Sequence, residues 1–376
     1  MPEISSRSPL FAPIKIGAVE IANRFVRAAT HEFMADASGG VADRLVLLMG
    51  DLAQGEVGLI ITGHAYVRPD GIASPRQTAV YDDRFIPALA RIPDAVHRTS
   101  ARIFLQISHS GRQTKAKMIG GLPISPSAVF EPAFGLMPRE MSAADVPDIR
   151  EAFLQAARRA RDAGFDGVQV HCAHGYLLSS FLSPHTNRRT DDWGGTTAKR
   201  ARLAVEIVAG IKEICGRDFP VIAKLNSTDF LPGGLDLEES LEIAGLLEAA
   251  GLDALEISGG MTEAGRGSVW EGVRAEKDEG YFVDAAARFK KALRIPVAGL
   301  GGNRTLAHME AIVREGRADL VSMSRPLVRE PGLVRAFRLG QTAKSACISC
   351  NKCFNPRGLS CGDLRISRHI PNRTIL

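Results

Sequence analysis

The chain has 376 residues, of which 45% are hydrophobic, so it can bury one large core or two modest ones. No apolar run approaches the roughly 18 residues that a transmembrane helix needs, and residues 1–7 lack the apolar segment of a secretory signal. These features predict a soluble cytoplasmic protein with no membrane partner.

The formal net charge of +5 is concentrated at the carboxyl end of the chain. From Gln341 onward there are six basic residues and one acid, Asp363, so residues 1–340 are balanced. A balanced body is not the kind of surface that binds nucleic acid. For the basic tail, a solvated terminus is the simplest interpretation and a nucleic-acid-binding tail is the alternative.

Apolar runs of strand length alternate with helical patterns along the chain. Most are rich in Val, Ile and Leu, which is typical of parallel strands covered on both faces. Eight such runs occur, at residues 24–30, 58–62, 102–108, 167–171, 221–225, 254–258, 296–299 and 319–323. Eight strand–helix pairs predict an α/β fold of the (β/α)8 TIM-barrel type, and a doubly wound open sheet is the alternative.

Two of the intervening segments show clear helical periodicity. In residues 145–163, apolar side chains recur every three or four positions before Gly164, and the same spacing runs from Leu237 to Leu247. The long segment 111–147 is rich in Pro and Gly. We expect it to be an excursion over the catalytic face of the barrel.

Two histidines and a tyrosine follow the fourth apolar run. His171 and His174 are three positions apart, and Tyr176 comes two residues later. In a barrel, the carboxyl ends of the strands carry the chemistry. Two ring N–H donors and a phenol directed at one spot can polarise a carbonyl oxygen and supply a proton. Half of a metal site and a pair of ordinary hydrogen-bonded histidines are the alternatives.

Two further polar residues stand in or at the end of apolar runs. Lys224 lies inside the fifth run, and a buried ammonium needs a partner. That partner is a carboxylate, an anionic cofactor, or a carbonyl substrate bound as a Schiff base. A structural lysine that reaches solvent is the alternative. Gln106 lies in the third run, and its side-chain amide can both donate and accept hydrogen bonds. It therefore suits a ring whose edge carries both donors and acceptors.

The turns after the seventh and eighth runs are candidates for a phosphate site. Glycines occur at or after the end of the seventh run, and Ser324 and Arg325 follow the eighth. Backbone amides freed by glycine, together with a guanidinium, form a common phosphate cradle in barrels. The glycines in question are Gly299, Gly301 and Gly302.

Several motifs occur in order over roughly residues 8–340. They are Asn23-Arg24-Phe25-Val26, Gly58-Leu59-Ile60-Ile61, Gln106-Ile107-Ser108-His109-Ser110-Gly111-Arg112, Pro138-Arg139-Glu140-Met141, His171-Cys172-Ala173-His174-Gly175-Tyr176-Leu177-Leu178, Phe181-Leu182-Ser183-Pro184, Asn187 and Arg189-Thr190-Asp191. With them the chain resembles the old yellow enzyme family of FMN-dependent ene-reductases. It is most similar to the branch that includes the flavin-binding barrel of bacterial dienoyl-CoA reductases.

This resemblance implies an enzyme that binds FMN, oxidises NADH or NADPH and reduces α,β-unsaturated carbonyl compounds. His171 and His174 would hold the substrate oxygen, and Tyr176 would stand where the family places its proton donor. Gln106 and Lys224 would bind the pyrimidine edge of the flavin. The other cofactor contacts that it implies are Ala28, Ala29, Gly299, Gly301, Gly302, Ser324 and Arg325.

The chain departs from the family pattern at two places. The family commonly has Thr or Cys beside the flavin carbonyl, whereas Thr30 and His31 both fall in that region here, and both are candidate contacts. His64, a further candidate, places an imidazole where a small residue is usual. The size of the substrate pocket is therefore expected to differ.

Four of the six cysteines lie close together in the tail, at Cys347, Cys350, Cys353 and Cys361. Crowded thiols in a cytosolic protein favour a metal site over disulfides, and four thiolates suit a [4Fe–4S] cluster or zinc. Reduced, free cysteines are the alternative. The dienoyl-CoA reductase branch carries such a cluster with wider spacing, fed by a domain that binds FAD and NAD. A cluster here would be vestigial, structural or served by a separate reductase.

The expected organisation is an FMN-binding barrel over residues 1–340 and a basic, cysteine-rich tail over 341–376. The leading hypothesis is an FMN-dependent reductase of small molecules, with amine demethylation as related chemistry on the same scaffold. A Schiff-base lyase or aldolase built on Lys224 is the second hypothesis. A non-catalytic metal- or nucleic-acid-binding module centred on the tail is the third. Family members often form dimers, so a homo-oligomer is expected.

Overall fold

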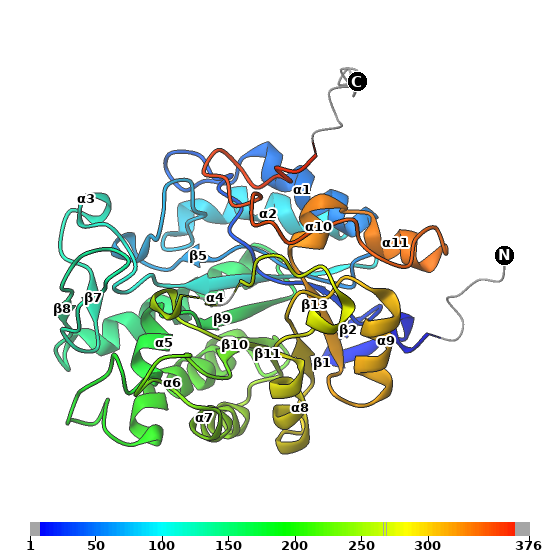
Figure 1. Ribbon diagram of the computed structural model, residues 1–376. Coiled ribbons are helices and arrows are strands. Elements are labelled where there is room, and N and C mark those ends of the chain that lie inside the picture. Colours follow the sequence, from blue (N-terminus) through cyan, green and yellow to red (C-terminus); the bar gives the residue numbers. More distant parts are fainter. Residues whose placement is uncertain (1–7, 266, 268, 365–376) are drawn as a thin grey trace.

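The computed structural model describes residues 8–265, 267 and 269–364, and its centre is a barrel of parallel strands (Figure 1). Strand β4 pairs with β3 on one side and with β6 on the other, which closes the ring. The predicted (β/α)8 barrel is therefore confirmed, and the alternative of an open sheet is wrong. The barrel strands are β3 Phe25–Arg27, β4 Leu59–Ile61, β6 Arg102–Ser108, β9 Gly167–Cys172, β10 Val221–Asn226, β11 Ala254–Ser258, β12 Val297–Gly299 and β13 Leu320–Met323.

Helices cover the outside of the barrel (Figure 1). They are α1 Asp43–Gln54, α2 Ile86–Val96, α4 Asp145–Asp162, α5 Leu177–Leu182, α6 Thr197–Cys215, α7 Leu237–Ala249, α8 Val283–Ala292, α9 Leu306–Arg314, α10 Arg325–Arg329 and α11 Leu333–Arg338. In α4, the periodic residues Ile149, Phe153 and Ala160 are fully buried. Burying a side chain such as Phe153 contributes about 1.5–3 kcal/mol. Gly164, at φ +87°, follows the helix as predicted.

A hairpin that the sequence did not predict closes the amino-terminal end of the barrel. Strands β1 (Ile14–Ile16) and β2 (Val19–Ile21) pair in antiparallel fashion. Their buried residues Ile16 and Ile21 belong to the same apolar cluster as Leu59 in the barrel interior. The interior is thus plugged at this end and open for a ligand at the other.

The segment 111–147 begins at the carboxyl ends of the strands, where Gln113 Nε2 donates to His174 O (2.8 Å). It then contacts α5 through the first strand of a small parallel sheet. The elements of this segment are α3 Ala116–Ile119, β7 Ile124–Ser125 and β8 Arg139–Glu140. Strand β5 (Ala65–Tyr66) extends the main sheet, and the short 3-10 turns are Pro9–Phe11, Pro69–Gly71, Asp83–Phe85, Thr262–Ala264 and Glu276–Asp278.

Residues 341–364, the described part of the tail, pack back onto the barrel. Leu306 N–H donates to Ala343 O (2.9 Å), and Leu359 N–H donates to Glu32 O (2.7 Å). These contacts fix the tail beside the ends of the strands that form the mouth of the barrel.

Two predictions fall partly outside the described residues. They concern the segment 1–7, examined for a secretory signal, and the basic residues Arg365, Arg368 and Arg373 of the tail. Within the described part of the chain, no helix is long and apolar enough to cross a membrane.

Candidate active site

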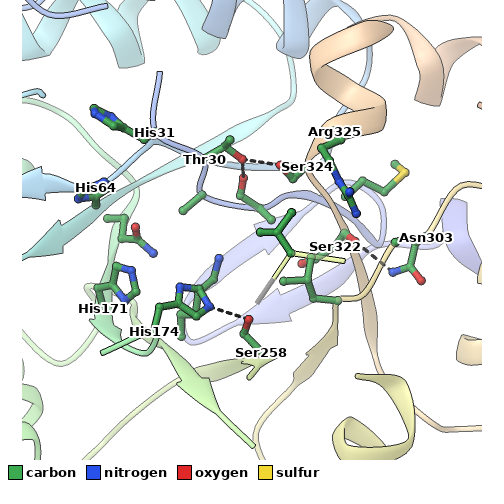
Figure 2. A pocket seen from close by; sticks show the side chains of 18 of the residues that line it. Thr30, His31, His64, His171, His174, Ser258, Asn303, Ser322, Ser324 and Arg325 are labelled. Carbon is green, nitrogen blue, oxygen red and sulfur yellow. Dashed lines mark hydrogen bonds between the residues drawn. The ribbon is translucent and has the colours of Figure 1, made fainter. Parts of the chain in front are cut away.

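A cavity of about 210 Å³ lies at the carboxyl ends of the barrel strands (Figure 2). All three predicted catalytic residues line it, as do most of the predicted cofactor contacts. These lining residues are Ala28, Ala29, Thr30, His31, His64, Gln106, His171, His174, Tyr176, Lys224, Gly302, Ser324 and Arg325. Gly299 and Gly301 do not line it.

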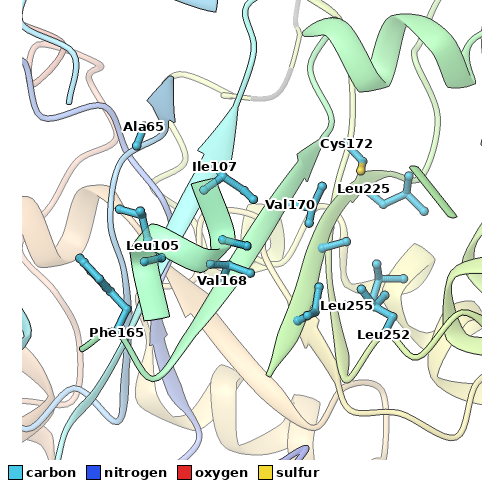
Figure 3. Close-up of a cluster of buried hydrophobic side chains, with 14 of the residues drawn as sticks. Ala65, Leu105, Ile107, Phe165, Val168, Val170, Cys172, Leu225, Leu252 and Leu255 are labelled. Atoms are coloured by element: carbon cyan, nitrogen blue, oxygen red, sulfur yellow. The ribbon is translucent and has the colours of Figure 1, made fainter. Parts of the chain in front are cut away.

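Strand alternation brings polar side chains into the barrel beneath this cavity. Val168 and Val170 of β9 pack in the apolar cluster between strands and helices, beside Leu105 and Ile107 of β6 (Figure 3). Successive side chains of a strand point to opposite faces, so Gln169 and His171, which alternate with these valines, point inward. One short strand therefore provides apolar side chains for the core on its outer face and polar side chains for the site on its inner face.

His171 and His174 form a close imidazole pair. Their ring centroids are 5.3 Å apart and the rings are perpendicular. Ala173 N–H donates to His171 Nδ1 (3.3 Å), so the hydrogen of a neutral His171 ring is on Nε2. His174 adopts φ +63°, and its Nε2 shares a hydrogen bond with Ser258 Oγ (2.8 Å, Figure 2). The Tyr176 ring lies 4.8 Å from that of His171.

Burial sets the protonation states of these three groups. Desolvation lowers the pKa of His171 well below its usual value, and neighbouring His174 adds to this effect. Desolvation, followed by the charge of Lys224, lowers the pKa of His174 to about 3. Desolvation raises the pKa of Tyr176 to about 12. At neutral pH the site thus holds two uncharged imidazoles, each with one N–H, and a protonated phenol.

A second pair of imidazoles narrows the cavity beside Tyr176. The rings of His31 and His64 are 4.9 Å apart, and His64 lies 5.2 Å from the Tyr176 ring. Gln77 Nε2 donates to His64 Nδ1 (2.8 Å), and His31 Nε2 bonds to Ser74 Oγ. Desolvation lowers the pKa of His64 to about 4. These rings occupy volume that a smaller residue would leave to a ligand.

The structure distinguishes the two candidates Thr30 and His31. Both line the cavity, but the Thr30 hydroxyl is already bonded to Ser324 Oγ (2.7 Å) and to Ala28 O (3.0 Å) (Figure 2). The ring of His31 lies against that of Phe33 at a tilt of 40°, with 3.7 Å between centroids. Thr30 therefore joins two loops of the mouth, whereas His31 presents a ring to the cavity.

The far end of the cavity is suited to an anion. Arg325 is buried and donates to Trp270 O (2.7 Å) and to Asn351 Oδ1 (2.8 Å). Ser322 Oγ and Asn303 Oδ1 line the same end and have no hydrogen-bond partner among the described residues. Because buried polar atoms are nearly always paired, these two atoms are suited to hydrogen bonds with a ligand.

Gly299 and Gly301 do not themselves line the cavity, although Leu300 and Gly302 beside them do, and the predicted role of this backbone in holding a phosphate stays a prediction. A Cβ on Gly299 would lie 3.3 Å from Val283 of α8, so this glycine allows close packing of the helix on the barrel. Gly301 has φ +129°, and a Cβ there would lie 2.7 Å from Tyr281 N. Gly302, at φ +75°, is the one of the three that lines the cavity. The other two shape the turn.

Comparison with known proteins decides the family. Residues 9–343 match the model of the NADH:flavin oxidoreductase / NADH oxidase family. The chain belongs to this family. It is 38% identical to an NADH oxidase of Thermoanaerobacter brockii over 91% of this chain and 52% of the relative. It is 35% identical to 4,4'-dithiodibutanoate disulfide reductase of Rhodococcus erythropolis over 92% of each chain.

Solved structures agree with this assignment. A 2-naphthoyl-CoA reductase complex superposes with a TM-score of 0.86 at 33% identity, covering 92% of this chain and 54% of that one. An old yellow enzyme homologue from Zymomonas mobilis superposes with a TM-score of 0.77 at 25% identity, covering 90% and 95%. The resemblance to old yellow enzymes is confirmed. The chain spans about half the length of the NADH oxidase and of the 2-naphthoyl-CoA reductase.

The residues present fit the FMN that membership of this flavin oxidoreductase family implies. Lys224, which is paired with Glu256 (3.2 Å), and Arg325 both line the cavity. The unpaired atoms Ser322 Oγ and Asn303 Oδ1 accompany Arg325. A flat heterocycle with a phosphate tail matches this set of polar groups.

The sequence did not predict four polar residues that line the cavity. Two of them could have been predicted from their positions, because Ser258 ends β11 and Ser322 lies in β13, where inward side chains reach the mouth of the barrel. Serine and asparagine are common at strand ends and turns for conformational reasons, so their presence there did not single them out as site residues. The four are Ser258, Tyr281, Asn303 and Ser322.

The four tail cysteines border one small hollow beside Arg325 and Arg329. Arg329 Nη1 lies 3.7 Å from Cys361 Sγ, and burial raises the pKa of Cys347 and of Cys353. Within the described residues, no group of three or more His, Cys, Asp or Glu side chains is arranged to hold a metal ion. The thiols are thus gathered but not in coordinating geometry.

Proposed function

We propose that this protein is an FMN-dependent oxidoreductase that transfers a hydride from NAD(P)H to an activated C=C bond, as in an α,β-unsaturated carbonyl compound. The neutral imidazole pair in a cavity that is also lined by Lys224 and Arg325 carries this proposal. Bound FMN supplies the chemistry of accepting a hydride from the nicotinamide and delivering it to the β-carbon of the substrate. Gln106 and Lys224 would hold its ring, and Arg325 its phosphate.

The side chains of this chain supply the rest of the reaction. The Nε2–H of His171 and the Nδ1–H of His174, whose Nε2 then accepts from the Ser258 hydroxyl, would donate to the substrate oxygen and draw charge away from the β-carbon. Tyr176 stays protonated at neutral pH and would give its proton to the α-carbon. Two N–H donors suit a carbonyl oxygen better than an ammonium, which favours ene reduction over amine demethylation.

The Schiff-base alternative has less support. Lys224 is in an ion pair with Glu256, and an ammonium in such a pair has no free lone pair to attack a carbonyl. The third hypothesis, a non-catalytic tail module, leaves the whole cavity without a role.

A second acceptor class comes from one relative. The protein named 4,4'-dithiodibutanoate disulfide reductase matches this chain over 92% of both lengths. A disulfide is therefore the rival acceptor. The test is to reduce the FMN-loaded protein anaerobically with NADH and then add either 2-cyclohexenone or 4,4'-dithiodibutanoate. We expect the enone to reoxidise the flavin faster; reoxidation by the disulfide alone would replace ene reduction with disulfide reduction.

The remaining proposals concern the tail and the assembly. We propose that residues 1–340 form the FMN-binding unit and that the tail cysteines, which border one hollow without being arranged around a metal ion in this structure, take up a [4Fe–4S] cluster served by a separate reductase. Iron and sulfide analysis after anaerobic purification tests the cluster: we expect both elements, and their absence removes the cluster and that reductase. A homo-oligomer and a cytoplasmic location stay predictions from sequence.

A further inference from the structure

Four polar side chains form a continuous chain across the barrel interior beneath the cavity. Gln106 Nε2 donates to Gln169 Oε1 (2.7 Å), and Gln169 Nε2 donates to Glu256 Oε2 (2.9 Å). The same Glu256 oxygen lies 3.2 Å from Lys224 Nζ. All four residues are at most 2% exposed. Only the two ends of this chain, Gln106 and Lys224, line the cavity.

The strand register explains why these side chains meet. Gln106 of β6 is paired with Gln169 of β9, and Lys224 of β10 is paired with Glu256 of β11. Paired residues on neighbouring strands point to the same side of the sheet, here the barrel interior. The chain of contacts is therefore built into the barrel and does not depend on a loop.

The carboxylate gives this chain of hydrogen bonds a direction. An ionised Glu256 can only accept, so Gln169 must present its NH2 group to it and its oxygen to Gln106. Gln106 must then donate one of its two Nε2 hydrogens to Gln169. This leaves Gln106 Oε1 and the second N–H for a ligand, in a fixed arrangement. With a neutral amide in place of Glu256, the side-chain amides of Gln169 and Gln106 could both rotate by 180° and exchange their donor and acceptor ends.

Stability of the fold does not account for Glu256. Replacing a buried ion pair with apolar residues is often neutral or stabilising. Glu256 Oε1 also has no hydrogen-bond partner among the described residues, which is a further cost for a buried carboxylate. The residue at this position therefore needs an explanation in terms of the site above it.

We propose that Glu256 is a positioning residue for the flavin ring. It acts on one side by balancing the charge of Lys224 and on the other by orienting Gln106 through Gln169. The proposal rests on FMN binding in the cavity, as proposed above. Its physical consequence is that Glu256 lowers the preference of the site for reduced FMN, since reduction adds negative charge to the ring that an unbalanced Lys224 would attract.

The first test variant is Glu256→Gln, which keeps the shape and removes the charge. We expect the reduced form of FMN to gain at least tenfold in affinity relative to the oxidised form. For a two-electron couple, that ratio is a rise of ~30 mV in the midpoint potential. Glu256→Asp, which restores the charge, should return the potential toward the wild-type value.

The second variant, Gln169→Leu, separates the two effects. It breaks the link to Gln106 and leaves the Lys224–Glu256 pair in place. We expect both oxidation states of FMN to bind more weakly, by roughly threefold to tenfold for one lost hydrogen bond. The ratio of the two affinities, and hence the potential, should stay unchanged.

The matched control is Asp253→Asn at the amino-terminal end of the same strand, where Asp253 pairs with Lys212 far from the cavity. It should lower the unfolding midpoint without changing FMN affinity or potential. If Glu256→Gln behaves like this control, the positioning role is wrong. If Glu256→Gln does not fold, unchanged FMN affinity in Gln169→Leu overturns the proposal. Wild-type protein that binds no FMN would instead overturn the proposed function itself.

Discussion

His171 and His174 owe their chemistry to the surroundings that the barrel gives them. An exposed histidine is half charged near pH 6.5, whereas desolvation holds these two uncharged across the neutral range. A neutral ring donates one hydrogen bond and accepts one, so its partners decide which nitrogen donates. Ala173 N–H makes that choice for His171.

We predict that His171→Ala weakens the binding of a phenolic ligand by about 1–3 kcal/mol, because one donor to the ligand oxygen is lost. Titration of the flavin absorbance with a substituted phenol measures the dissociation constant. His97→Ala is the control, since His97 pairs with Asp166 outside the cavity. Equal affinities for wild type and His171→Ala would remove this histidine from the ligand site.

His64 makes stability depend on pH. The pKa of this histidine is about 4 in the folded protein and ~6.5 when unfolded, so below pH 6.5 the unfolded chain binds a proton that the folded chain does not. The contribution of His64 to the free energy of unfolding is therefore fully present above pH 6.5, and it decreases as the pH drops toward 4. The slope from this one residue is at most ~1.4 kcal/mol per pH unit.

We predict that in His64→Asn the free energy of unfolding depends less steeply on pH, because close to one proton fewer is taken up on unfolding. Urea unfolding at several pH values between 4 and 7 measures it. A variant whose stability falls with pH as steeply as that of the wild type would mean that His64 is not held neutral by burial.

At the scale of elements, each barrel strand separates scaffold from site by alternation. In β9, Val168 and Val170 pack outward against the helices, while Gln169 and His171 point inward. Helix α4 packs on β6 and β9, and none of its residues lines the cavity. Changes on the two faces should therefore have separable effects.

We predict that Phe153→Ala, in the buried stripe of α4, destabilises the fold by about 3–5 kcal/mol and leaves FMN affinity unchanged. Chemical unfolding and FMN titration below the transition measure the two effects. Glu151→Ala, on the exposed face of α4, is the control and should change neither. Weaker FMN binding in Phe153→Ala would show that the helix layer and the site are coupled.

The sequence predicted the elements with long apolar runs and missed those without them. All eight barrel strands were placed, because runs such as 102–108 and 221–225 are continuous and bounded by turns. The β1–β2 hairpin was missed because Lys15 and Glu20 stand in the middle of its two strands, so that neither forms a continuous apolar run. Of the three predicted glycines only Gly302 lines the cavity, and sequence alone cannot tell a glycine that faces a ligand from one that packs against a helix.

At the scale of the whole molecule, the cavity is assembled from distant parts of the chain. Ala28 follows the first barrel strand in the sequence and Arg325 follows the last, yet both line the same cavity as Phe354 of the tail. Tertiary contacts of this kind explain why the network through Gln169 and Glu256 was not predicted. Each of these two residues, taken alone, is an ordinary polar residue in a strand, and only closure of the barrel brings them together.

The measurement that tests the central claim most directly is a visible absorption spectrum of the protein with FMN, taken before and after anaerobic addition of NADH. We predict one equivalent of tightly bound FMN, with the yellow colour of the oxidised flavin, that bleaches when NADH is added. A colourless protein that does not bind added FMN would contradict the account.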